Sequence, residues 1–172
     1  MPPVTVEYLK LLLHDFVRQN GTPIDLILIG ALALEAYGVE TRSTVDVDAE
    51  VQGPLEALRD FLDKAGIPSD LGANISGWSV ISLPPGYRDR ARLYHKGPGV
   101  TVRLLHPCDY VIAKLRRGTE DDLEDARKVA RHLHVTETEI REAVAAATTA
   151  SPADTALLLF HRLVDRFCQT EI

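Results

Sequence analysis

The sequence predicts an α/β protein, nearer to the α+β type, with a small mixed sheet followed by a C-terminal helical segment. Strand-like segments lie among amphipathic helices over the first two thirds of the chain, and only helical patterns follow. The 172 residues are 45% hydrophobic and 26% charged, which suits one domain with a real core. We therefore expect a folded domain over residues 1–133 and a helical extension over residues 134–172 that packs on it.

Each element follows from a local pattern of side chains. Apolar residues at helical spacing predict a helix over residues 6–17, which Asn20-Gly21 ends. The apolar run 26–29 is typical of a buried strand, and apolar and acidic residues alternate over residues 44–51 as in a second strand. Further strands are expected at 78–83, 90–95 and 100–105, and further helices at 31–37, 55–65, 107–117 and 123–133, with two more opening at 136 and 151.

Composition excludes several classes of protein. The net charge is −6, which argues against wrapping duplex nucleic acid. Two cysteines, Cys108 and Cys168, are too few for a disulfide framework or a cysteine-rich zinc site. The start of the chain lacks the features of a signal peptide, and the longest apolar stretch is too short for a bilayer, which needs roughly 20 residues. We expect a soluble, cytoplasmic protein with no membrane partner.

The charge is unevenly distributed along the chain. Residues 86–117 carry eight basic and two acidic side chains, whereas residues 1–85 carry five basic and twelve acidic ones. Such a block is either an anion site, since phosphate binds converging Arg and Lys, or a solvated face that balances acidic neighbours. The histidines predict no metal site, because His132 and His134 are two apart on an expected helix and face different directions.

The sharpest feature is a pair of carboxylates, Asp46 and Asp48, on the second expected strand. Residues two apart on a strand point to the same face, so these carboxylates lie close together and repel unless a cation lies between them. Hard oxygen ligands favour Mg²⁺, which completes its shell with water and substrate phosphate. Upstream, Gly30 lies between a strand and a helix, where a missing side chain lets a polyphosphate approach the backbone. The alternative is an ordinary polar strand face, which Glu50 continues.

Four segments of the chain together resemble a known family. A strand, Gly30-Ala31, a short helix and then Asp46-Val47-Asp48 resemble the first motif of the polymerase-β-like nucleotidyltransferases, where Gly-Gly or Gly-Ser precedes Asp-x-Asp. The downstream motifs resemble the minimal bacterial branch related to AbiEii and MenT toxins. They are Leu83-Pro84-Pro85-Gly86-Tyr87-Arg88-Asp89-Arg90, Asp109-Tyr110-Val111-Ile112-Ala113-Lys114-Leu115 and Arg117-Gly118-Thr119-Glu120-Asp121-Asp122-Leu123-Glu124-Asp125, and the resemblance spans roughly residues 24–133.

The resemblance implies an enzyme that moves a nucleoside monophosphate from a nucleoside triphosphate to an acceptor hydroxyl and releases pyrophosphate. Asp46 and Asp48 would hold Mg²⁺ or Mn²⁺, which aligns the α-phosphate and offsets charge in the transition state. The acceptor would be RNA, such as a tRNA end, or a protein, and a toxin role would bring a cognate antitoxin as partner. The triphosphate or an RNA acceptor would be bound by Gly30, Ala31, Ser43, Thr44, Arg88, Arg90 and Lys114.

The sequence departs from the family pattern at two places. Ala31 stands where a second Gly or Ser is usual, and the strand over 100–105 carries Arg103 but no third carboxylate. Asp122 or Asp125 would then supply the missing acid. Two alternatives to the enzyme stay open: a catalytically degenerate fold that binds a nucleotide or a protein, and a helical interaction module over residues 136–172.

Overall fold

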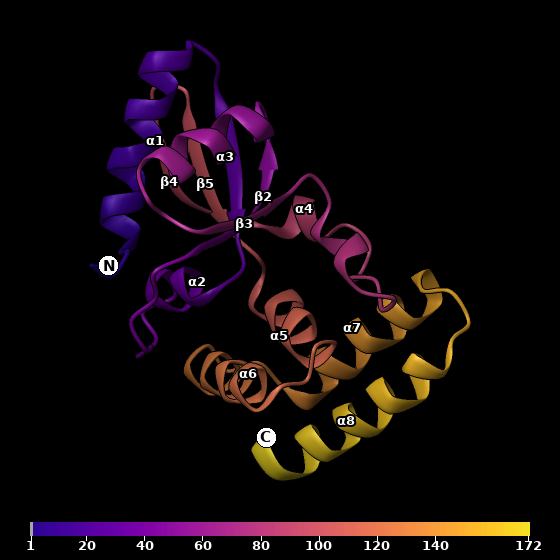
Figure 1. The fold of residues 1–172 in the computed structure, drawn as a ribbon. Helices are drawn as coiled ribbons and strands as arrows, with labels where there is room; N and C mark the ends of the chain where they lie inside the picture. Colours follow the sequence, from indigo (N-terminus) through magenta and orange to yellow (C-terminus); the bar gives the residue numbers. More distant parts are fainter. Residues whose placement is uncertain (1) are drawn as a thin grey trace. The chain divides into compact units, whose positions relative to one another are not determined.

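The computed structural model describes residues 2–172 and contains a five-stranded mixed sheet with helices, which confirms the predicted fold class (Figure 1). The chain divides into two compact units. The first comprises the residues up to 75 together with 91–104, and the second comprises 76–90 and 105–172. The domain boundary expected after residue 133 stays a prediction; Leu133 is the C-cap of a helix within the second unit.

The first unit contains the whole sheet, in the order β3-β2-β1-β5-β4. Strand β1 pairs antiparallel with β2 and parallel with β5, while β2 and β3 are parallel and β4 and β5 antiparallel. The sheet is therefore mixed, as the sequence predicted. The strands are β1 (Ile24–Leu28), β2 (Val47–Gln52), β3 (Ser69–Gly72), β4 (Arg92–Gly97) and β5 (Val100–Leu104).

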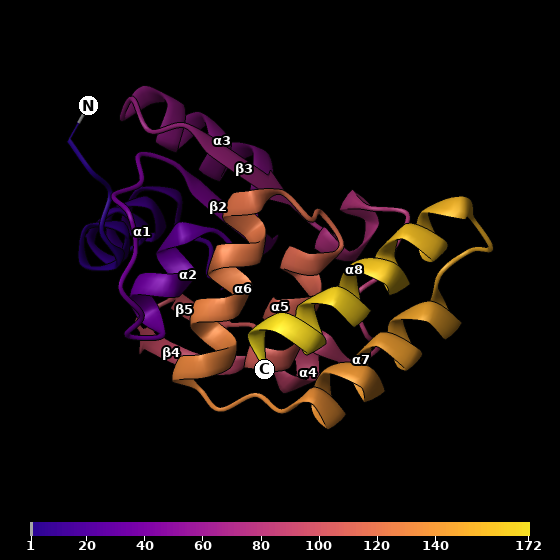
Figure 2. The ribbon, with the colours of Figure 1, turned by 90° about the horizontal axis from the view of Figure 1, so that it is seen from below.

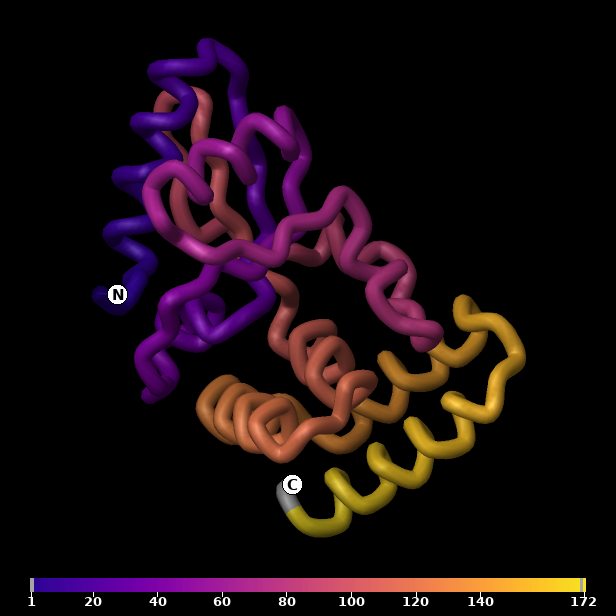
Figure 3. Tube along the Cα trace, in the orientation of Figure 1, coloured from indigo at the N-terminus to yellow at the C-terminus, as the bar shows by residue number. Residues whose placement is uncertain are grey.

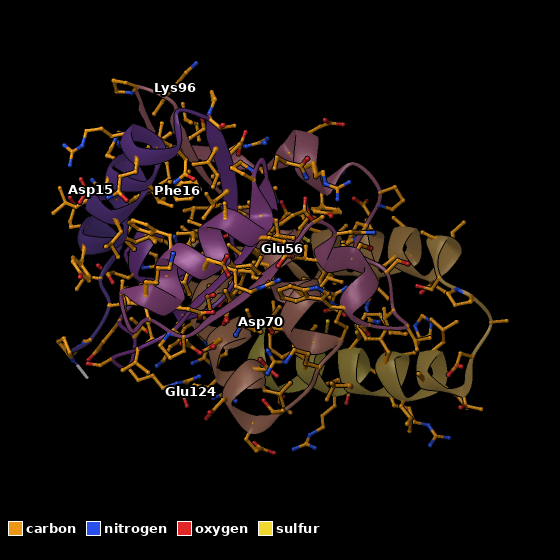
Figure 4. The ribbon with its side chains drawn as sticks, turned by 45° about the horizontal axis from the view of Figure 1, so that its top comes forward. Asp15, Phe16, Glu56, Asp70, Lys96 and Glu124 are labelled. Carbon is orange, nitrogen blue, oxygen red and sulfur yellow. The ribbon has the colours of Figure 1, made fainter. Side chains whose placement is uncertain are left out.

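Three helices accompany this sheet: α1 (Val6–Asn20), α2 (Ala31–Ala36) and α3 (Leu55–Lys64). Phe16 of α1 and Phe61 of α3 meet edge to face, with ring centroids 5.5 Å apart. Figure 4 shows Phe16 directed towards the interior while its neighbour Asp15 points outwards. Burial of the apolar stripe of α1 against the sheet follows from the helical spacing in its sequence.

The second unit is helical, with α4 (Tyr87–Arg90), α5 (Pro107–Leu115), α6 (Glu120–His132), α7 (Glu137–Ala150) and α8 (Thr155–Glu171). Helices α7 and α8 run side by side in opposite directions, as Figures 1 and 2 show from two sides. Figure 3 shows the chain turning back between them. The capping box expected at residues 136–139 is present at the start of α7.

The strand expected over residues 78–83 is wrong. A 3₁₀ helix, η1 (Ile75–Trp78), and bends occupy this region. Arg116 donates to the carbonyls of Ser76 and Ile81, at 3.1 and 3.0 Å, and the Leu83 N–H donates to the Ser76 hydroxyl. Side chains thus satisfy backbone groups that a neighbouring strand would otherwise pair.

Over residues 2–172, none of the helices combines the length and the apolar character that a membrane span requires.

Candidate functional site

The contact between Gly30 and Asp48 is the central feature of the first unit. The Ile29 N–H donates to the Asp48 carbonyl at 3.1 Å, which places the end of β1 beside the start of β2. A Cβ on Gly30 would lie 2.9 Å from both Cβ and Cγ of Asp48 and would collide with its carboxylate. Gly30 has a negative φ of −86°, so the position needs glycine for this close approach and not for its backbone conformation.

Asp46 lies immediately before β2, so the strand expected from residue 44 begins three residues later, at Val47. Asp46 is exposed and accepts a hydrogen bond from the Thr44 hydroxyl. The shared face expected for Asp46 and Asp48 stays a prediction, because the alternation of a strand applies to Asp48 in β2 and Asp46 lies outside it. Ser43 is exposed, and Ala31 is the first residue of α2. The structure therefore brings Gly30, Thr44 and the Asp-x-Asp segment to one end of the sheet.

Glu50 extends this carboxylate row into the protein. Its side chain is completely buried, and Oε2 accepts the Ile75 N–H at 2.9 Å. In the alternative interpretation of the sequence, Glu50 continues an ordinary polar strand face; the structure instead buries it, which alternation alone does not reveal. The buried carboxylate fixes the backbone at Ile75, where the first of the two segments of the first unit ends.

Ile27 of β1 pairs with Glu50 of β2 on one side and with Arg103 of β5 on the other. At the level of Glu50, strand β5 therefore carries an arginine and no acid. Arg103 forms a two-pronged ion pair with Asp25, with Nε and Nη2 at 3.0 and 2.8 Å from its two carboxylate oxygens. The guanidinium of Arg103 therefore already has a local partner.

The donor set suits Mg²⁺ or Mn²⁺ only with help from a substrate. Among residues 2–172, no group of three or more His, Cys, Asp or Glu side chains is arranged to hold a metal ion. Asp46 and Asp48 supply carboxylate oxygens, which are the ligands that these hard cations prefer, and their remaining ligands would be phosphate and water.

In the second unit, Lys114, Asp122 and Asp125 form one buried ion cluster. Lys114 Nζ lies 2.8 Å from Asp125 Oδ2 and 3.3 Å from Asp122 Oδ1. All three side chains are buried: Lys114 is 8% exposed, Asp122 2% and Asp125 1%. Asp122 also belongs to the capping box of α6, where it accepts from Thr119. The cluster thus joins the end of α5 to the first turns of α6, while its proposed roles in phosphate binding or catalysis stay predictions.

Arg90 is bound within its own unit. It makes a two-pronged pair with the buried Asp109, with both contacts at 3.0 Å, and donates to the carbonyls of Pro85 and Pro84 at 2.8 and 3.3 Å. The hydrogen bond to Asp109 raises the pKa of Arg90. Arg90 therefore holds the Pro-Pro-Gly turn, and its proposed contact with a triphosphate would compete with these bonds. Exposed Arg88 lies over the Tyr87 ring, 5.1 Å from its centroid.

The basic side chains of residues 86–117 fall into two groups in the structure: those bound to groups inside the protein and those exposed on its surface. Burial lowers the pKa of Arg116 to about 10, and this guanidinium holds loop carbonyls. The internally bound members of the block are Arg90, Arg103, Lys114 and Arg116. Those with exposed side chains are Arg88, Arg92, Lys96 and Arg117. Much of the block therefore balances local acids and carbonyls, as the second of the two sequence interpretations holds.

Comparison with known proteins places the chain in a family. Residues 9–154 match the family described as a nucleotidyltransferase of unknown function (DUF6036), and the chain belongs to this family. Among solved structures it is similar to an antigenic nucleotidyltransferase-like protein from Paracoccidioides brasiliensis, with 15% identity and a TM-score of 0.47 over 99% of this chain and 96% of that one. No curated protein matches the chain. The nucleotidyltransferase assignment is confirmed at the level of the family.

Proposed function

We propose that this protein transfers a nucleoside monophosphate from a nucleoside triphosphate to an acceptor hydroxyl. The observation that carries the proposal is the contact of Gly30 with Asp48, because a residue without a side chain is required exactly where the first carboxylate motif meets the end of β1. An ordinary polar strand face would place no such demand on residue 30. Membership of the nucleotidyltransferase family agrees with this reading.

In the proposed reaction, the acceptor oxygen bonds to the α-phosphorus and the bond from that phosphorus to the pyrophosphate oxygen breaks. Pyrophosphate leaves, and the proton of the acceptor hydroxyl passes to water. Asp46 and Asp48 would hold Mg²⁺ or Mn²⁺, which would neutralise charge on the phosphates when bound. Thr44 holds the Asp46 carboxylate through its hydroxyl, and the missing side chain at Gly30 leaves room for the Asp48 carboxylate beside the end of β1. Lys114 and Arg88 are proposed to bind phosphate or an RNA acceptor.

A second candidate is a nucleotide-binding module without catalysis. The observation that favours it is that β5, the later strand from which the resemblance implies a third carboxylate, carries Arg103, which is paired with Asp25. A guanidinium there supplies neither a metal ligand nor a base. Asp122 and Asp125, the proposed substitutes, already bind Lys114.

The finer assignment, a toxin of the AbiEii- and MenT-related branch that modifies tRNA or a protein and is neutralised by an antitoxin, is supported by the motif resemblance alone. Growth arrest on induced expression, relieved by Asp46→Asn, would support it. Unimpaired growth with abundant active protein would contradict it.

The test of the proposed activity is incubation of the full chain with Mg²⁺, total RNA and each α-labelled nucleoside triphosphate in turn. Label in RNA or protein is expected from the native chain and is lost in Asp46→Asn. Asp60→Asn is the matched control, because it removes an exposed carboxylate from α3 and should retain activity. Nucleotide binding without any transferred label would overturn the enzyme and favour the binding module.

A further inference from the structure

Two histidines far apart in the sequence meet between α1 and the edge strand β4. The Nε2 atoms of His14 and His95 lie 2.9 Å apart, and their rings stand nearly perpendicular, at 88°. The two Nε2 atoms therefore share one hydrogen bond, in which one ring donates its proton to the lone pair of the other. The same two nitrogens are the ones best placed to bind a single metal ion.

Gly97 shows that this arrangement needs room. A Cβ on Gly97 would lie 2.5 Å from Cε1 and 3.0 Å from Nε2 of His14, and 3.3 Å from Nε2 of His95. Gly97 does not have a positive φ, so its backbone conformation is open to other residues. Glycine is thus needed at residue 97 because the two imidazole rings occupy the space that a side chain would fill.

The nearby charges nearly cancel. Lys10, one turn before His14 on α1, pairs with Glu7 at 2.6 Å, so a cation at the imidazoles meets both signs of charge. A neutral imidazole ring is the form that coordinates metals.

We propose that His14 and His95 form a binding site for a transition-metal dication of the Zn²⁺, Ni²⁺ or Cu²⁺ class, which ties α1 to the edge of the sheet. Imidazole nitrogen suits these ions and not Mg²⁺, so the site is independent of the carboxylates and of the proposed function. The ring that now donates through Nε2 shifts its proton to Nδ1, and both Nε2 lone pairs then face the ion. Zinc–nitrogen bonds of 2.0–2.1 Å in tetrahedral geometry require the two nitrogens to be about 3.3 Å apart. The nitrogens therefore need to separate by a few tenths of an ångström, and the rings need to turn so that both lone pairs meet at the ion.

The test is titration of the full chain with Zn²⁺ in excess Mg²⁺, followed by calorimetry and by NMR of the imidazole nitrogens. We expect one Zn²⁺ per chain, joint shifts of the His14 and His95 Nε2 signals, and a higher melting temperature. His14→Ala and His95→Ala should each weaken binding at least tenfold, and Gly97→Ala should do the same by filling the space.

His132→Ala is the matched control, since it removes an exposed histidine at the end of α6 and should bind Zn²⁺ as the native chain does. Undiminished binding in the His14→Ala/His95→Ala double variant would overturn the proposal. So would shifts confined to other histidines, or a native chain that binds no more Zn²⁺ than the double variant. Circular dichroism of each variant separates loss of the site from loss of the fold.

Discussion

At the scale of single residues, Gly30 carries the strongest prediction. The Gly30→Ala variant places a methyl group against Asp48, so either the carboxylate or the end of β1 must move. We expect loss of nucleotide transfer and a cost of about 1–3 kcal/mol in unfolding free energy, the usual range for overpacking. Urea unfolding and the labelling assay measure the two effects. Asp60→Asn, at an exposed position of α3, is the control and should keep both; full activity in Gly30→Ala would refute the proposed role of the contact.

Cys108 illustrates how environment, and not residue type, sets reactivity. Burial, with neighbouring Asp109 and Glu139, raises the pKa of its thiol to about 12, and Sγ donates to the Glu139 carbonyl at 3.2 Å. A raised pKa lowers the thiolate fraction at every pH below it, to about one part in ten thousand at pH 8. Iodoacetamide at pH 8 should therefore leave Cys108 unmodified in the native protein and label it in urea, as mass spectrometry can show. Rapid native labelling would contradict this.

At the scale of elements, the Lys114 cluster predicts how strongly α5 and α6 depend on each other. Lys114→Met removes the cation that lies closest to Asp125 and leaves Asp122 with its longer pair to Arg117, for which we expect a loss of about 3 kcal/mol in unfolding free energy. Lys128→Met is the control, because Lys128 forms a surface pair with Glu124 and should cost less than about 0.5 kcal/mol. Equal urea midpoints for the two variants would show that the cluster contributes little to stability.

The start of α7 gives a prediction with a pH dependence. Hydrogen bonds from the backbone and the hydroxyl of Thr136 lower the pKa of Glu139. A lowered carboxyl pKa adds stability that is complete above the unfolded value, about 4.3, and is lost as pH falls through the folded value. Thr136→Ala should therefore cost about 1 kcal/mol at pH 7 and less below pH 4. Thermal unfolding across this range tests it, and a cost that grows in acid would be inconsistent with the capping box.

At the scale of the whole molecule, the sequence predicts what depends on local periodicity and misses what depends on distant side chains. The fold class and most helices follow from apolar spacing, and the Gly30 and Asp48 motif could be found because both residues belong to one short segment. The strand expected at 78–83 fails because Arg116, more than thirty residues later, binds carbonyls there. The pair of His14 and His95 is separated by 81 positions, which no local pattern connects.

The last prediction concerns the whole molecule: nucleotide binding should slow amide hydrogen exchange in the unit that contacts the nucleotide. Amide hydrogen exchange is measured on the full chain with Mg²⁺ and a non-hydrolysable triphosphate. Slower exchange is expected over residues 28–36 and 44–50 in the first unit, because the Gly30 backbone and the Asp-x-Asp segment lie there. If Arg88 and Lys114 also bind phosphate, residues 83–90 and 111–117 of the second unit are slowed as well. Asp46→Asn should remove the protection everywhere, with Asp60→Asn unchanged. Protection of the first unit alone would leave Lys114 as a purely structural cation, held by its two aspartates.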